Sequence, residues 1–173
     1  QGDAIQIGFF DGSLSNLGLN SGVVMSTGDI SILDPNFVGF GDFINIDPQV
    51  TDPDLLDVAN SVPSLIGQNF EVISVNDIAV LEFDFIPSSD TVFFRYVFGS
   101  QEYFGFENSI FNDVFGFFIS GPGIVGPYAS PATFPNGSIN IATFESQEVN
   151  SLGVNLPITI SSICNYPDDF GGP

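Results

Sequence analysis

The sequence contains no histidine and no lysine, and its 173 residues include one arginine, Arg95. Without histidine there is no imidazole base, no Ser-His-Asp triad and no histidine-bound zinc. Without lysine there is no Schiff base and no Walker-type lysine to hold a phosphate. One arginine cannot neutralise a nucleic-acid backbone, so we expect no nucleic-acid partner. Paired carboxylates are the acid–base chemistry that this composition leaves.

Cysteine, tryptophan and long apolar runs are also scarce. The single cysteine, Cys164, excludes an internal disulfide and lies in an apolar run that favours a small buried side chain. Tryptophan is absent, which weakens a sugar-stacking role because its ring offers the largest amphipathic face. No apolar run reaches the ~20 residues of a membrane-spanning helix, so we expect no membrane insertion.

Carboxylates and phenylalanine dominate what is present. The chain has 21 acidic residues, a net charge of -20, 43% hydrophobic residues and 20 phenylalanines, which we expect to form its core. The length favours one domain over residues 1–173. Because the charges repel one another in a compact state, some carboxylates are candidate ligands of calcium, which prefers hard oxygen donors. The alternative is a solvated acidic surface of a secreted or salt-adapted protein.

Short apolar runs broken by Gly, Pro, Asn, Asp and Ser predict an all-β fold, of β-sandwich or jelly-roll type. One short helix is expected near residues 53–60, where Asp52 suits the N-cap, Pro53 the first turn and Pro63 limits the length. The expected strands cover residues 4–10, 22–26, 79–86, 91–98, 114–119, 138–144 and 156–163.

The strands at 79–86 and 91–98 are expected to form a hairpin around the turn at 87–90. Counting back from the turn places Glu82 opposite Arg95 on one face, with Asp84 on the diagonal. The sequence therefore predicts a structural ion pair of Arg95 with Glu82, reinforced by Asp84. The alternative is a set of exposed charges that contributes about 1 kcal/mol or less.

The segment between residues 98 and 118 places polar oxygens beside aromatic residues. Oxygen ligands next to rigid apolar anchors are what a calcium site requires. We therefore predict a calcium site; the competing interpretations are a loop held by Asx-type hydrogen bonds and, third, a catalytic site. The candidate ligands are Glu102, Glu107, Asn112 and Asp113.

Three motifs carry a resemblance to a known family: DIAVLEFDFIP at 77–87, FRYVFGSQEY at 94–103 and FNDVFGFFISGPG at 111–123. Together with weaker matches at 7–10, 17–28, 140–142 and 157–160, they resemble the choice-of-anchor L domain. The resemblance implies a non-enzymatic, secreted or cell-surface β module of bacteria with an adhesive or structural role.

Two departures from the family pattern affect this interpretation. Gln101 stands where the family usually has a glutamate, which removes one candidate acidic ligand. The family domain also normally continues beyond the end of this chain, so the chain is a fragment or a neighbouring copy supplies the missing strands. An open sheet edge accepts such a strand, which makes self-assembly into a filament a serious hypothesis beside a monomeric module. The expected partners are copies of the chain, other cell-surface proteins or glycans.

Two rival functions and two modification motifs complete the predictions. A glycan-binding module would stack sugars on Tyr96, Tyr103 or exposed phenylalanines, and a glycoside hydrolase would use a carboxylate pair such as Glu82 and Glu102. Asn136 begins a weak N-glycosylation motif. Thr91 lies in a turn that resembles an O-glycosylation motif of some bacteria with surface layers. Both motifs are also ordinary turn sequences.

Overall fold

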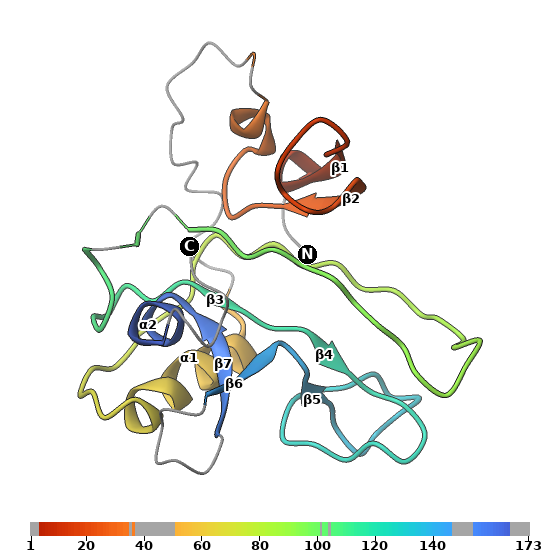
Figure 1. Ribbon diagram of the computed structural model, residues 1–173. Coiled ribbons are helices and arrows are strands. Elements are labelled where there is room, and N and C mark those ends of the chain that lie inside the picture. Colours follow the sequence, from red (N-terminus) through yellow and green to blue (C-terminus); the bar gives the residue numbers. More distant parts are fainter. Residues whose placement is uncertain are drawn as a thin grey trace. The chain divides into compact units, whose positions relative to one another are not determined.

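The structure is a computed structural model that describes residues 4–34, 36, 51–100, 102–103, 105–146 and 154–166. Figure 1 shows its helices and strands. The chain divides into two compact units. Unit 1 comprises Gln1–Thr51 and Asn76–Val97, and unit 2 comprises Asp52–Val75 and Phe98–Pro173. Each unit is described by itself.

Unit 1 contains a two-stranded antiparallel sheet. A 3₁₀ turn, η1 (Ala4–Gln6), leads into β1 (Ile7–Asp11), which pairs with β2 (Ser21–Met25). A second 3₁₀ turn, η2 (Ile30–Leu33), follows and is capped by the side chain of Asp29. The strands expected at 4–10 and 22–26 are therefore confirmed, with the first beginning three residues later than predicted.

Gln6, just before β1, holds the start of this sheet through side-chain hydrogen bonds within unit 1. Its side chain is buried, and its amide nitrogen donates to the carbonyl oxygens of Thr27 at 3.3 Å and Asp77 at 3.2 Å. A buried amide needs such partners, since leaving it without them costs about 1–3 kcal/mol. The contact joins the N-terminal sheet to the segment that opens the following hairpin, 71 residues away in sequence.

That hairpin spans residues 79–97 and is called the apolar hairpin below. Its two arms run side by side as extended traces (Figure 1), but within the described residues neither arm is assigned as a strand. The rings of Phe85 and Phe94 meet edge to face at 5.9 Å, and those of Phe83 and Phe85 lie 6.1 Å apart. The two arms thus lie side by side, and their predicted register stays a prediction. The predicted strands at 79–86 and 91–98 are wrong.

Unit 2 contains the predicted helix, which is longer than expected. α1 runs over Pro53–Leu65, and the Asp52 carboxylate caps it by accepting from the N–H groups of Asp54 and Leu55. Pro63 lies inside the last turn, where it removes one helical hydrogen bond without breaking the helix. The helix ends at Leu65. Just beyond it, Gly67 adopts a φ of 69° and the Gln68 N–H donates to Pro63 O.

The described part of unit 2 also contains two small antiparallel sheets. The first has the order β3-β7-β6, with β3 at Val114–Phe115, β7 at Val154–Thr159 and β6 at Thr143–Ser146. The second pairs β4 (Phe118–Ile119) with β5 (Ile139–Asn140). The strands expected at 114–119 and 138–144 are each divided in two, because their halves pair with different partners.

The C-terminal strand was expected to run over 156–163, and this prediction is wrong beyond residue 159. The chain turns there into α2 (Ile160–Asn165). A capping box causes the change, since the Thr159 hydroxyl accepts from Ser162 N–H and the Ser162 hydroxyl accepts from Thr159 N–H. The apolar residues Ile158, Ile160 and Ile163 favoured a strand in the sequence, and the capping signal of Thr159 and Ser162 was not considered.

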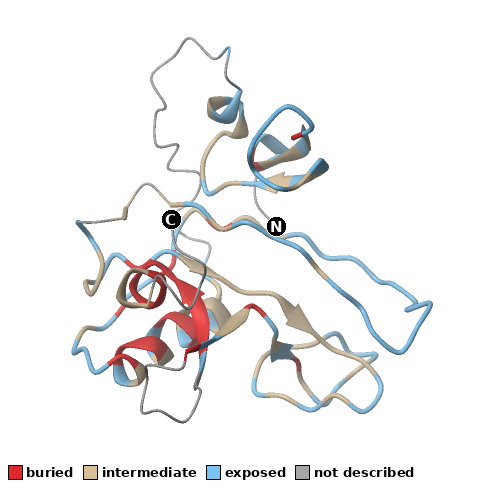
Figure 2. Ribbon diagram, viewed as in Figure 1, coloured by how far each residue is buried: buried red, intermediate tan, exposed pale blue. Residues whose placement is uncertain are grey.

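The core of unit 2 is aliphatic. One cluster centres on Val62, Ile66 and Leu156, and another on Ala142, Ile158 and Ile163. Figure 2 shows the buried residues concentrated in α1, α2 and β7. No phenylalanine of the described ranges is fully buried, so the expectation of a phenylalanine core is wrong; phenylalanines instead pack around these clusters or are exposed. The fold is mainly β, and the sandwich arrangement stays a prediction.

Candidate functional site: an acidic loop anchored on α2

The candidate calcium ligands all lie in unit 2, in the loop that joins Phe98 to β3. We call residues 99–113 the acidic loop. Its second half is tied to α2, where Ser161 is fully buried and bonds to the loop through two groups. The Asn108 N–H donates to Ser161 Oγ at 3.0 Å, and the Ser161 N–H donates to Asn112 Oδ1 at 3.0 Å. The loop is therefore held by residues about fifty positions further along the chain.

A third hydrogen bond completes this anchor. The Asn165 side chain donates to Asn108 Oδ1 at 2.9 Å and to Ser161 O at 2.7 Å. Asn108 has a φ of 59°, the left-handed conformation that asparagine tolerates better than most residues. These contacts agree with the interpretation of the segment as a hydrogen-bonded loop, and they assign Asn112 an anchoring role.

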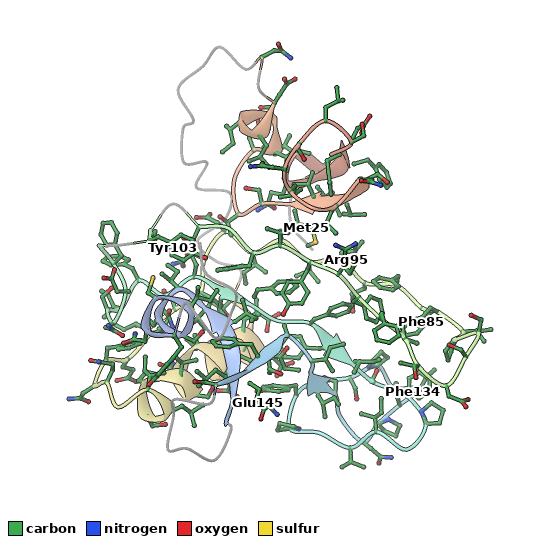
Figure 3. All side chains as sticks on the ribbon, viewed as in Figure 1. Met25, Phe85, Arg95, Tyr103, Phe134 and Glu145 are labelled. Atoms are coloured by element: carbon green, nitrogen blue, oxygen red, sulfur yellow. The ribbon has the colours of Figure 1, made fainter. Side chains whose placement is uncertain are left out.

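The first half of the loop brings two of the predicted carboxylates together. The Ser100 hydroxyl donates to Asp113 Oδ2 at 2.7 Å and accepts from the Glu102 N–H at 3.0 Å. Burial raises the pKa of the Glu102 carboxyl above its ordinary value, and the nearby charge of Asp113 adds to the increase. Tyr103 is affected in the same way, because burial and then the charges of Cys164 and Asp113 raise its pKa. The label in Figure 3 locates Tyr103 in this loop.

Two carboxylate oxygens of the loop lack a hydrogen-bond partner. Oε2 of Glu102 and Oε2 of Glu107 are both buried without one, and so is the amide nitrogen of Asn112. Unpartnered carboxylate oxygens are compatible with an ion site. However, among the described residues no three Asp, Glu, Cys or His side chains come close enough to hold a metal ion. Calcium binding at Glu102, Glu107, Asn112 and Asp113 therefore stays a prediction.

Arg95 makes a different contact from the one predicted. Its Nη2 donates to Gly18 O at 2.9 Å, in the loop between β1 and β2. Figure 3 shows Arg95 and Phe85 on the apolar hairpin. Within the part of unit 1 that the structure describes, no ion pair joins Arg95 to Glu82 or Asp84, and both carboxylates are exposed. The ion pair remains a prediction that a double-mutant cycle can test.

The two candidate glycosylation residues are exposed, but their surroundings differ. Thr91 follows the hairpin turn, and its carbonyl oxygen accepts from the Ser89 hydroxyl. Asn136 is also exposed, whereas Ser138 of the same motif is buried and its hydroxyl donates to Ala129 O at 2.7 Å. The folded chain thus presents the Thr91 motif more openly than the Asn136 motif.

Sequence reasoning missed an aromatic pair at the tip of the acidic loop. Phe106 and Phe111 meet edge to face, with ring centres 5.7 Å apart and an interplanar angle of 85°. Both side chains are about half exposed. Their five-residue separation matches neither strand nor helix periodicity, so the sequence contained no regular signal for the pair.

Comparison with known proteins assigns the chain to a family. A family model of the choice-of-anchor L domain matches residues 1–165. The chain belongs to the choice-of-anchor L domain family. No curated protein and no solved structure matches it.

Membership confirms the resemblance drawn from the three motifs. A choice-of-anchor L domain indicates a module of a bacterial cell-surface protein, and the family is not a known enzyme family. Neither helix in the described ranges is long and apolar enough to cross a membrane.

Proposed function

We propose that this choice-of-anchor L domain is a non-enzymatic, extracellular structural or adhesive module that self-assembles by strand sharing along the apolar hairpin. The observation that carries the proposal is the exposure of large apolar side chains on both arms of that hairpin. Ile86 is 95% exposed and Phe93 is 87% exposed, and five further apolar residues are at least two-fifths exposed. These are Leu81, Phe83, Phe85, Val92 and Val97.

Apolar exposure of this extent favours an interface. Monomeric soluble proteins rarely leave large contiguous apolar patches open to water, and such patches mark interaction sites. An extended exposed segment is also the geometry to which a strand of another chain adds, with main-chain hydrogen bonds providing affinity and side chains specificity. Strand sharing would cover the hairpin and supply neighbours to arms that are not strands in the isolated chain.

Charge opposes this assembly and makes it dependent on salt. Every copy carries a net charge of -20, and the hairpin itself carries Glu82, Asp84 and Asp90 against Arg95. Repulsion between copies is screened over roughly 8 Å at physiological ionic strength and over about 3 Å at 1 M salt. Added salt should therefore promote assembly.

Negative-stain electron microscopy and sedimentation velocity test the proposal at about 0.15 M and about 1 M NaCl. The wild-type chain should form filaments or oligomers whose fraction increases with salt. The double variant I86S/F93S should remain monomeric, while L14S, which alters a fully exposed leucine in the β1–β2 loop, should assemble as the wild type does. Dispersed monomers at every salt concentration, or equal loss in both variants, would contradict strand sharing through the hairpin.

A further inference from the structure

The tip of the acidic loop forms a second exposed apolar surface, separate from the apolar hairpin. Phe106 is 50% exposed, Phe111 is 53% exposed, and Ile110 between them is 51% exposed. Single exposed apolar residues are common, but three neighbouring ones around a ring contact form a patch. In the described part of this loop, residues 105–106 and 110–111 are exposed, and residues 107–109 between them are half-buried.

The patch is held in place by polar groups behind it. The Ser109 hydroxyl donates to Phe106 O and accepts from the Phe111 N–H at 3.1 Å, which fixes the backbone on both sides of the ring pair. Between them, Asn108 is tied to Ser161 and Asn165 of α2. Because the surface is already ordered, a partner would lose less conformational entropy on binding it than on binding a mobile loop.

Charge decides which kind of partner fits. The same loop carries Glu102, Glu107 and Asp113 and no basic residue. A second copy would bring a further net charge of -20 with one arginine, so like charges would meet across the contact. A surface with lysine or arginine around an apolar side chain would instead be complementary to the patch in both charge and polarity.

We propose that the apolar tip formed by Phe106, Ile110 and Phe111 docks a basic, apolar polypeptide segment of another protein. An aliphatic or aromatic side chain of that segment packs against the two rings. Its basic side chains meet the net negative charge of the chain, to which the exposed Asp113 carboxylate of the loop contributes. This surface lies in unit 2 and does not depend on self-assembly through the hairpin of unit 1. The two proposals can therefore fail independently.

Fluorescence anisotropy with three labelled synthetic peptides tests the proposal on the whole chain. One peptide alternates leucine with lysine, the second alternates leucine with glutamate, and the third alternates serine with lysine. The Leu-Lys peptide should bind. The double variant F106S/F111S should bind it at least about tenfold more weakly, as expected when aromatic anchors of an interface are truncated. The Ser-Lys peptide should bind weakly and equally to both proteins, and the Leu-Glu peptide should not bind.

Matched variants separate the patch from general attraction to an acidic protein. F9S removes an aromatic residue that is 90% exposed in β1, so it should bind the Leu-Lys peptide like the wild type. I110S, which leaves both rings in place, provides a milder test if F106S/F111S does not fold, as judged by its melting curve. Equal binding by F106S/F111S and wild type, or equal loss in F9S, would overturn the proposal. Binding of neutral oligosaccharides that F106S/F111S alone abolishes, without peptide binding, would identify a glycan site and also overturn it.

Discussion

Removal of the Asn112 side chain should destabilise unit 2 by an amount that the structure allows us to estimate. Asn112 is 6% exposed, and its Oδ1 accepts the N–H of Ser161, which is completely buried. In Asn112→Ala that N–H loses its partner inside the protein, which costs about 1–3 kcal/mol. A loss of about 2 kcal/mol lowers the melting temperature of a domain of this size by roughly 4–8 °C.

Urea unfolding followed by circular dichroism and tyrosine fluorescence measures this change, since no tryptophan obscures the tyrosine signal. Asn112→Asp keeps an acceptor oxygen for the Ser161 N–H but buries a negative charge beside Asp113, so at pH 7 it should lose at least as much stability as the alanine variant. Asn136→Ala alters an exposed asparagine and should have almost no effect. A loss below about 0.5 kcal/mol in Asn112→Ala, or an equal loss in Asn136→Ala, would refute the assigned hydrogen bond as an anchor of the loop.

Three further predictions concern charged groups. Because the pKa of Glu102 is raised above its ordinary value of 4.5, its contribution to stability is present below that pH and is lost as pH rises through the raised pKa. Glu102→Gln should therefore have a higher melting temperature than the wild type at pH 7, and the difference should vanish below pH 4.5. A difference that does not depend on pH, or the same gain in the exposed control Glu71→Gln, would contradict this. If calcium binds the acidic loop, calcium should raise the melting temperature relative to chelator, and Glu107→Gln should reduce that increase; identical curves with calcium and chelator would exclude the site. Arg95→Met should lose about 1 kcal/mol or less, because its bond to Gly18 O is exposed, and a double-mutant cycle with Glu82→Gln will show a coupling energy only if the predicted ion pair forms.

Short sequence motifs were sufficient to predict those helices and strands whose ends are determined by residues next to them in the sequence. The Asp52 N-cap followed by Pro53 identified α1, and the Asp and Gly residues around β1 and β2 marked their ends. The strand expected at 114–119 failed because its break depends on tertiary contacts. A Cβ atom on Gly116 would lie 2.6 Å from the Phe118 ring and 2.9 Å from Leu55, so this glycine permits a close approach where the chain changes sheets.

The acidic loop was only partly predicted, because its acidic residues are close in the sequence whereas the residues that anchor it are distant. Its carboxylates lie close together in the sequence, so their concentration was visible, and Glu102 and Asp113 do lie near each other. The partners that fix the loop were not visible, since Ser161 and Asn165 lie between 49 and 57 residues away from the groups they bind. The chain gives no local indication of a contact over such a separation, and α2 itself was expected to be a strand.

The position of these anchors has a consequence for the order in which the chain acquires its structure. Contacts between residues distant in sequence form late, because the chain between them must first be ordered. Ser161 is synthesised about fifty residues after Asn108 and Asn112, so the tip with Phe106 and Phe111 cannot become fixed until β7 and α2 have emerged. A chain that is cut before residue 160 would retain every residue of the tip but none of its support from α2. This surface can therefore take its final form only after the chain has been made and folded through residue 165.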